Sequence, residues 1–86
     1  MDKARRDDIL AFIIISGGQV RLSFLSQYLD IKQEELEELE EQHLIRIHEI
    51  PGDKIVMLGP RISEYFVERV LIEQNKWIKK LILRED

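Results

Sequence analysis

The sequence predicts a single α+β domain of 86 residues that is mainly helical and carries one small β-hairpin. Three observations predict this class. Apolar residues in 3–15 recur at helical spacing, apolar and polar residues alternate on both sides of a Pro-Gly turn in 44–58, and a long helical pattern follows Pro60. We expect residues 1–59 to form three helices and the hairpin, and residues 60–86 to form a long C-terminal helix.

The first helix is predicted over residues 3–15, KARRDDILAFIII. Leu10, Ile13 and Ile14 give spacings of three and four residues, and Asp2 can cap the start. The isoleucine run would also suit a strand, but the helix formers before it favour a helix and the SGG after it favours a stop. Other positions of this helix are apolar too, so it is apolar on more than one face.

A short strand and a short second helix are predicted after the glycines. Val20 and Leu22 alternate with polar residues, which is enough for a short strand. Ser23 then begins the second helix, and a tight turn at Asp30-Ile31 ends it. The inward positions of this helix are Leu25, Tyr28 and Leu29.

The third helix is predicted in KQEELEELEEQ, residues 32–42, with Leu36 and Leu39 as its core residues. Residues 30–42 contain one Asp, six Glu and one Lys, which is a local charge of −6. The formal net charge is −4, so the rest of the chain sums to +2. Glutamates four residues apart on this helix repel each other, at about 0.2–0.5 kcal/mol per pair. The acidity of the chain is therefore a patch on one helix.

The β-hairpin is predicted over residues 44–58. HLIRIHEI alternates, with Ile45 and Ile47 on one face and Arg46 and His48 on the other. The following Pro-Gly pair suits the two central positions of a type II turn, and KIVMLG forms the return strand.

The last helix is expected to carry assembly. Pro60 stands where a first helical turn tolerates proline, and residues 60–84 can continue as one helix about 37 Å long. Its second half, NKWIKKLIL, would expose large apolar side chains, which usually marks an interface. We expect a homodimer or a small hetero-complex. The residues predicted for this interface are Phe66, Val70, Trp77, Ile78 and Leu81.

Several chemistries are excluded by composition and spacing. The chain has no cysteine, which excludes disulfides and removes the usual ligand of zinc. His43 and His48 lack metal-ligand spacing, and no glycine-rich phosphate loop is present. We expect no enzyme, no cofactor and no metal site. Without a signal peptide or a membrane-spanning run, we expect a cytoplasmic protein. The high Ile, Glu and Lys content is typical of thermophiles.

The predicted order of elements resembles a winged helix-turn-helix domain over the whole chain. Three segments carry the resemblance: GGQVRLSFLSQYLDI is similar to the link into the second helix, IKQEELEELEEQHLI to the third helix and its exit, and LGPRISEYF to the helix entry after the wing. His43 departs from the pattern, because glycine is common at that exit. These are patterns of hydrophobicity and turns, so they imply the fold and leave the function open.

In DNA-binding relatives the third helix enters the major groove. Its outward positions here would be Gln33 and four glutamates, which phosphates would repel from within a Debye length of roughly 8–10 Å. We therefore expect a non-enzymatic protein–protein interaction module with weak or absent DNA binding and no membrane contact. The resemblance implies a setting in replication or transcription machinery. The acids expected to face a basic protein, or only solvent, are Glu34, Glu37, Glu38 and Glu41.

The alternative function is a dimeric winged-helix transcription regulator that binds double-stranded DNA. The contacts would then come from Lys32, Gln33, Arg46 and Lys54, and the glutamates would be tolerated. An ordinary solvated surface is a third interpretation of the acidic helix.

Overall fold

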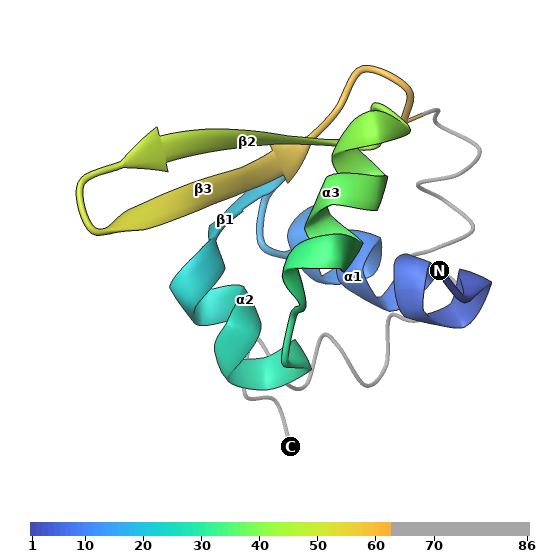
Figure 1. The fold of residues 1–86 in the computed structure, drawn as a ribbon, viewed down its shortest axis with the longest axis horizontal. Helices are drawn as coiled ribbons and strands as arrows, with labels where there is room; N and C mark the ends of the chain where they lie inside the picture. The colour runs from blue at the N-terminus through green and yellow to red at the C-terminus, as the bar shows by residue number, and fades with distance from the viewer. Residues whose placement is uncertain (63–86) are drawn as a thin grey trace.

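The computed structural model describes residues 1–62, which form three α-helices and one three-stranded antiparallel sheet (Figure 1). The elements in chain order are α1 (Lys3–Ile15), β1 (Gln19–Arg21), α2 (Leu22–Leu29), α3 (Gln33–Glu41), β2 (Ile45–Ile50) and β3 (Asp53–Leu58). The architecture is α+β, and its order of elements is compatible with a winged helix-turn-helix domain. None of these helices is long and apolar enough to cross a membrane.

The sequence predicts a C-terminal helix that begins at Pro60, but residues 60 and 61 lie in a turn, and the rest of that helix, from residue 63, lies outside the described residues. The same holds for the residues predicted to carry assembly, which are Phe66, Val70, Trp77, Ile78 and Leu81. Their role stays a prediction.

The sheet has the order β1-β3-β2, so β3 is the central strand. Val56 in β3 pairs with Val20 in β1 and with Ile47 in β2. Figure 1 shows the β2–β3 hairpin extending past the helices to one side. Because side chains alternate along a strand, one face of this sheet covers the core and the other faces away from it.

The core is built around α1. Its five consecutive residues Ile9–Ile13 are fully buried, which requires neighbours on every side of the helix. The ring of Phe12 lies 5.7 Å from that of Phe24 and 5.9 Å from that of Tyr28, between ring centroids. Leu36 and Leu39 of α3 are buried, as predicted. The apolar faces of all three helices therefore meet in one core.

The ends of the first two helices follow local chemistry. The N–H of Gly18 donates to the carbonyl of Ile13 at 2.9 Å, with Gly18 at φ 96°, so the predicted SGG stop is confirmed. Asp2 occupies the N-cap position of α1, but its side chain makes no capping hydrogen bond. The predicted strand position of Leu22 is wrong. β1 ends at Arg21 and Leu22 is the first residue of α2.

The hairpin has the predicted bounds to within one residue. β2 begins at Ile45 and β3 ends at Leu58. Gly52 has φ 77°, the left-handed conformation that the third position of a type II turn requires.

The exit from α3 depends on a histidine in a conformation that glycine prefers. His43 has φ 60°, and the next N–H, that of Leu44, donates back to the carbonyl of Leu39 at 3.0 Å. Gly59 packs directly against this turn, and its N–H donates to the carbonyl of Leu44 at 2.8 Å. A Cβ on Gly59 would lie against the His43 carbonyl and 2.9 Å from the nitrogen of Ile45.

We expect His43→Gly to raise the free energy of unfolding by about 0.5–1 kcal/mol. Relief of the left-handed strain, about 1–2 kcal/mol, outweighs the extra chain entropy that glycine loses on folding. Urea denaturation measures the change.

Gly59→Ala provides the opposite case at the same turn. The added methyl meets backbone atoms that cannot move alone, so we expect a loss of about 1–3 kcal/mol. An unchanged or lower stability of His43→Gly, or a neutral Gly59→Ala, would show that this turn is not under the stated constraint.

Candidate functional site

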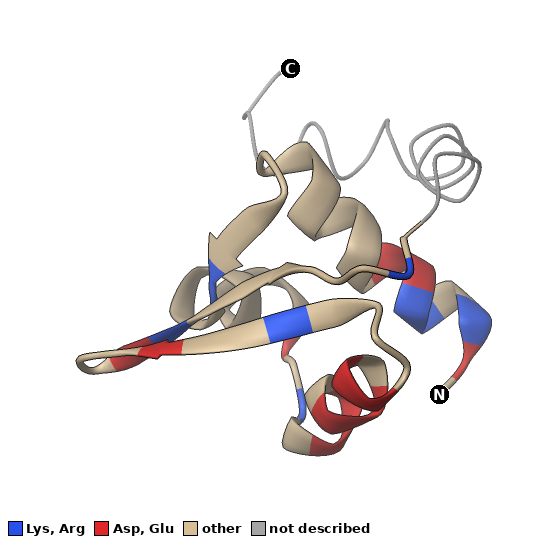
Figure 2. Ribbon diagram, turned by 90° about the horizontal axis from the view of Figure 1, so that it is seen from above, with Lys and Arg blue, Asp and Glu red and all other residues tan. Residues whose placement is uncertain are grey.

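The acidic surface of α3 is the strongest charged feature of the described residues. Figure 2 shows acidic residues along this helix, whereas Lys and Arg lie on α1, on the sheet and just before α3. Glu34, Glu37, Glu40 and Glu41 are exposed, and none of them forms an ion pair within residues 1–62. Among these four side chains, Glu37 accepts a weak hydrogen bond of 3.4 Å from the amide of Gln33.

Glu35 differs from these four glutamates because it turns inward to Arg5 of α1. The Nε of Arg5 lies 2.7 Å from one carboxylate oxygen of Glu35, and an Nη lies 3.2 Å from the other. This is the two-pronged geometry in which a guanidinium binds a carboxylate most strongly. The Glu35 side chain is only 16 % exposed, so solvent screens the pair less than an ordinary surface pair.

Arg5 also fixes the turn between α2 and α3. The same guanidinium donates to the backbone carbonyls of Leu29 and Asp30, at the C-terminal end of α2. Asp30 adopts a left-handed φ of 47° there. Glu35 in turn accepts a hydrogen bond of 3.0 Å from the N–H of Lys32, and so satisfies a free donor at the start of α3. One arginine therefore joins all three helices.

The two partners shift each other's pKa in opposite directions. The hydrogen bond from Arg5 is the main cause that lowers the pKa of Glu35 below its ordinary value of 4.5, and burial opposes it. The hydrogen bond to Glu35 likewise raises the pKa of Arg5. Both groups are charged at neutral pH, so the contact is an ion pair there.

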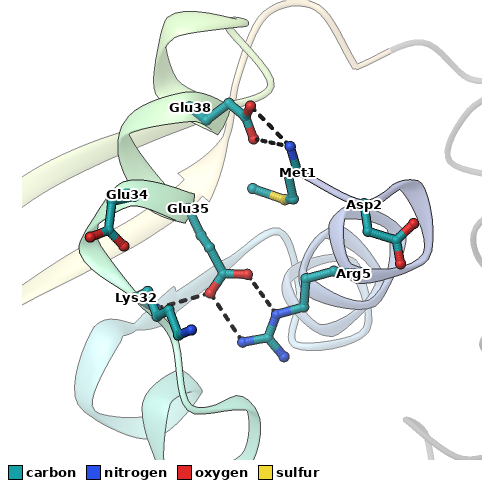
Figure 3. A pocket seen from close by; sticks show the side chains of 7 residues that line it. All are labelled: Met1, Asp2, Arg5, Lys32, Glu34, Glu35 and Glu38. Carbon is teal, nitrogen blue, oxygen red and sulfur yellow. Dashed lines mark hydrogen bonds and ion pairs between the residues drawn. The ribbon is translucent and has the colours of Figure 1, made fainter.

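A pocket of about 440 Å³ opens where α1 and the start of α3 meet (Figure 3). The Arg5–Glu35 pair forms part of its wall, and the amino group of Met1 lies 3.1 Å from the carboxylate of Glu38. Figure 3 shows Glu34 directed away from both pairs. Arg5 and the amino group of Met1 already face carboxylates, whereas Lys32, Asp2 and Glu34 line the pocket without an ion pair within residues 1–62.

The predicted site residues separate into two groups in the structure. Glu34, Glu37 and Glu41 share the exposed side of α3, whereas Glu38 is half-buried. Lys32 and Gln33 stand at the N-terminal end of the same helix. They therefore lie beside the acids.

Arg46 and Lys54, the other predicted DNA contacts, lie on the hairpin. Arg46 pairs with Met57 and Lys54 with Glu49, and the alternation of each strand places the two cations on opposite faces of the sheet. The structure therefore does not gather the predicted DNA contacts into one surface.

A second cross-connection ties the hairpin to α2. The carboxylate of Asp53, at the start of β3, accepts hydrogen bonds from the hydroxyl of Ser23 at 2.6 Å and from its N–H at 3.2 Å. These bonds lower the pKa of Asp53. Because Ser23 lies in the first turn of α2, Asp53 caps that helix from another element.

Sequence reasoning missed both the Arg5–Glu35 and the Ser23–Asp53 contacts. Each joins residues 30 positions apart. The spacing of Glu35 three residues after Lys32 is the only local signal, and it is incomplete because a lysine side chain cannot accept a hydrogen bond.

No group of three or more His, Asp or Glu side chains within residues 1–62 is arranged to hold a metal ion. Comparison of the chain with protein-family models, with curated proteins and with solved structures finds no match. The function is therefore argued from the site alone.

We expect Glu35→Gln to lower the free energy of unfolding by about 1–2 kcal/mol at pH 7, because a charge-assisted contact becomes a neutral one. The lowered pKa sets the pH dependence. The ion pair stabilises the fold fully above pH 4.5, and its contribution disappears as the pH falls through the lower folded pKa. Urea denaturation across this range measures both effects.

Glu34→Gln is the matched control, since Glu34 is an exposed neighbour in the same turn without a salt bridge in the described part of the chain. We expect its effect to stay within about 0.5 kcal/mol. Equal losses of unfolding free energy in the two variants would contradict the assigned role of the pair. So would a loss in Glu35→Gln that stays the same size at the lowest pH.

Proposed function

We propose that this chain is a non-enzymatic winged-helix module that docks a basic protein surface through the exposed acids of α3. The helix order and the hairpin support the winged-helix assignment, in which α3 holds the place of the DNA-reading helix. The observation that carries the proposal is the set of exposed acids on α3, none of which has a cation partner among residues 1–62.

The distribution of charge on α3 separates a structural side from a docking side. Arg5 is already bound to Glu35 on the inner side, and the amino group of Met1 is bound to Glu38. On the outer side, neighbouring glutamates repel each other, and no ion pair of the described fold offsets that cost. A basic partner would offset it, whereas phosphate would add to it.

The setting we propose is DNA-associated machinery, where winged-helix domains act in replication and transcription. Assembly as a homodimer or a small hetero-complex through residues 60–86 belongs to the same proposal. In that arrangement the acidic helix faces the partner and the C-terminal segment holds the copies together.

The second candidate is a dimeric regulator that binds double-stranded DNA. It is favoured by Arg46 and Lys54, two cations of the hairpin without an ion pair inside the described range. Lys32 and Gln33 would add contacts from the start of α3. The exposed glutamates beside them weigh against this candidate.

Two titrations distinguish the candidates. The first uses a labelled duplex of about 20 base pairs, two helical turns. The second uses a labelled peptide rich in Lys and Arg, which stands in for a basic protein surface. At about 50 mM salt we expect the chain to bind the peptide and not the duplex. Fluorescence anisotropy measures both.

The triple variant Glu34→Gln, Glu37→Gln and Glu41→Gln removes the acids that carry the proposal, and Glu49→Gln on the hairpin is its control. We expect the triple variant to lose most peptide binding and the control to retain it. Micromolar binding of the duplex with a steep salt dependence would reject the docking function and support the regulator.

A further inference from the structure

The outer face of the sheet carries a second charged surface, opposite in sign to α3. The strand register aligns its residues in two rows that cross all three strands. The first row is Gln19, Met57 and Arg46, and the second row is Arg21, Ile55 and His48. Each row has an apolar residue of β3 in its centre and a polar or basic residue at either margin.

Burial confirms that this face lies away from the core. Arg21 and Arg46 are exposed, while Ile55 and Met57 are half-buried. Val56, between the last two in sequence, is fully buried on the opposite face. Neighbouring strands lie about 4.8 Å apart, so the two margins are separated by about 10 Å, close to the width of an α-helix.

The arginines of this face, Arg21 and Arg46, form no close ion pair within residues 1–62, although the charge of Arg21 helps to lower the pKa of Asp53. The nearest acid in the register is Asp53, at the end of the rows, and its oxygens already accept three hydrogen bonds, from Ser23 and Lys54. The face therefore presents net positive charge around an apolar centre.

We propose that this outer sheet face docks the acidic side of α3 from a second copy of the chain. The inference deepens the proposed function, on which it rests, by naming the basic protein surface that α3 meets. Charge complementarity selects the occupant, since α3 holds the strongly acidic surface of the described fold and residues 30–42 sum to −6. The outer sheet face carries Arg21 and Arg46 against Asp53, so each copy offers one surface of each sign.

This contact is electrostatic and is therefore distinct from an apolar interface. Because every copy carries both surfaces, two copies can pair about a two-fold axis, with α3 of each copy docked on the sheet of the other. If only one such contact forms, further copies can add at the unused surfaces. Salt screens pairs of exposed charges, so the association must weaken as ionic strength rises.

The test reverses the charge of one surface at a time in the full chain of 86 residues. One variant reverses the sheet, with Arg21→Glu and Arg46→Glu. The other reverses the exposed side of the helix, with Glu34→Lys, Glu37→Lys and Glu41→Lys. Lys3→Glu, an exposed cation at the start of α1, is the control. Sedimentation equilibrium measures the mass of each protein at about 50 mM and 300 mM salt, one on each side of physiological screening.

For the unaltered chain and the control, we expect the association constant to be at least about tenfold lower at the higher salt. Screening of several charge pairs produces a change of this size. Each charge-reversed variant alone loses this salt-dependent association. An equimolar mixture of the two restores it, because each acidic sheet then meets a basic helix and each acidic helix meets a basic sheet. Restoration in the mixture also shows that both variants are folded.

A mass of the unaltered chain that is independent of salt would overturn the inference, and so would a mixture that fails to associate. Either result leaves the peptide and duplex titrations of the proposed function unaffected. Failure of this particular partner is therefore distinguishable from failure of the docking function.

Discussion

The position of α3 depends on one arginine. Arg5 binds the carboxylate of Glu35 at 2.7 Å and 3.2 Å and also binds the carbonyls that end α2. The backbone turns sharply at Asp30, and the carbonyls at a helix end need donors. Arg5 supplies them from α1 while Glu35 caps α3. The angle between α2 and α3 is thereby set by a charged contact as well as by the leucines beneath it.

This constraint divides α3 into two sides with different tasks. Leu36, Leu39 and Glu35 hold the helix to the rest of the fold, and the other acids are left to face outward. Because Arg5 is committed to the inner side, no ion pair within residues 1–62 neutralises the outer side of α3. The outer face of the sheet carries the exposed Arg21 and Arg46, so residues 1–62 present opposite charges on separate elements. This polarity supports docking between proteins more than approach to a phosphate backbone.

Local sequence signals predicted most of the described fold. Spaced leucines, the SGG stop and the Pro-Gly turn located α1, α3 and the hairpin to within a residue or two, because each acts over a few neighbouring positions. His43 was recognised as a departure from glycine, and its left-handed φ explains why glycine suits that position. Contacts such as Arg5–Glu35 and Ser23–Asp53 could not be predicted, since they exist only once distant segments are folded together. Helical spacing predicted that Glu34, Glu37 and Glu41 face outward, but it placed the half-buried Glu38 with them, left out the exposed Glu40 and gave no sign of the inward role of Glu35.

Amide hydrogen exchange of α3 in an Arg5→Gln variant tests the central claim most directly. If Arg5 holds α3 in place, the amides of Leu36 and Leu39 should lose about tenfold in protection, equivalent to roughly 1.4 kcal/mol of local opening, while those of β3 keep theirs. Equal loss in α3 and β3 would mean that Arg5 contributes only to global stability. Unchanged protection in α3 would mean that the leucines alone position the helix, and would contradict the account.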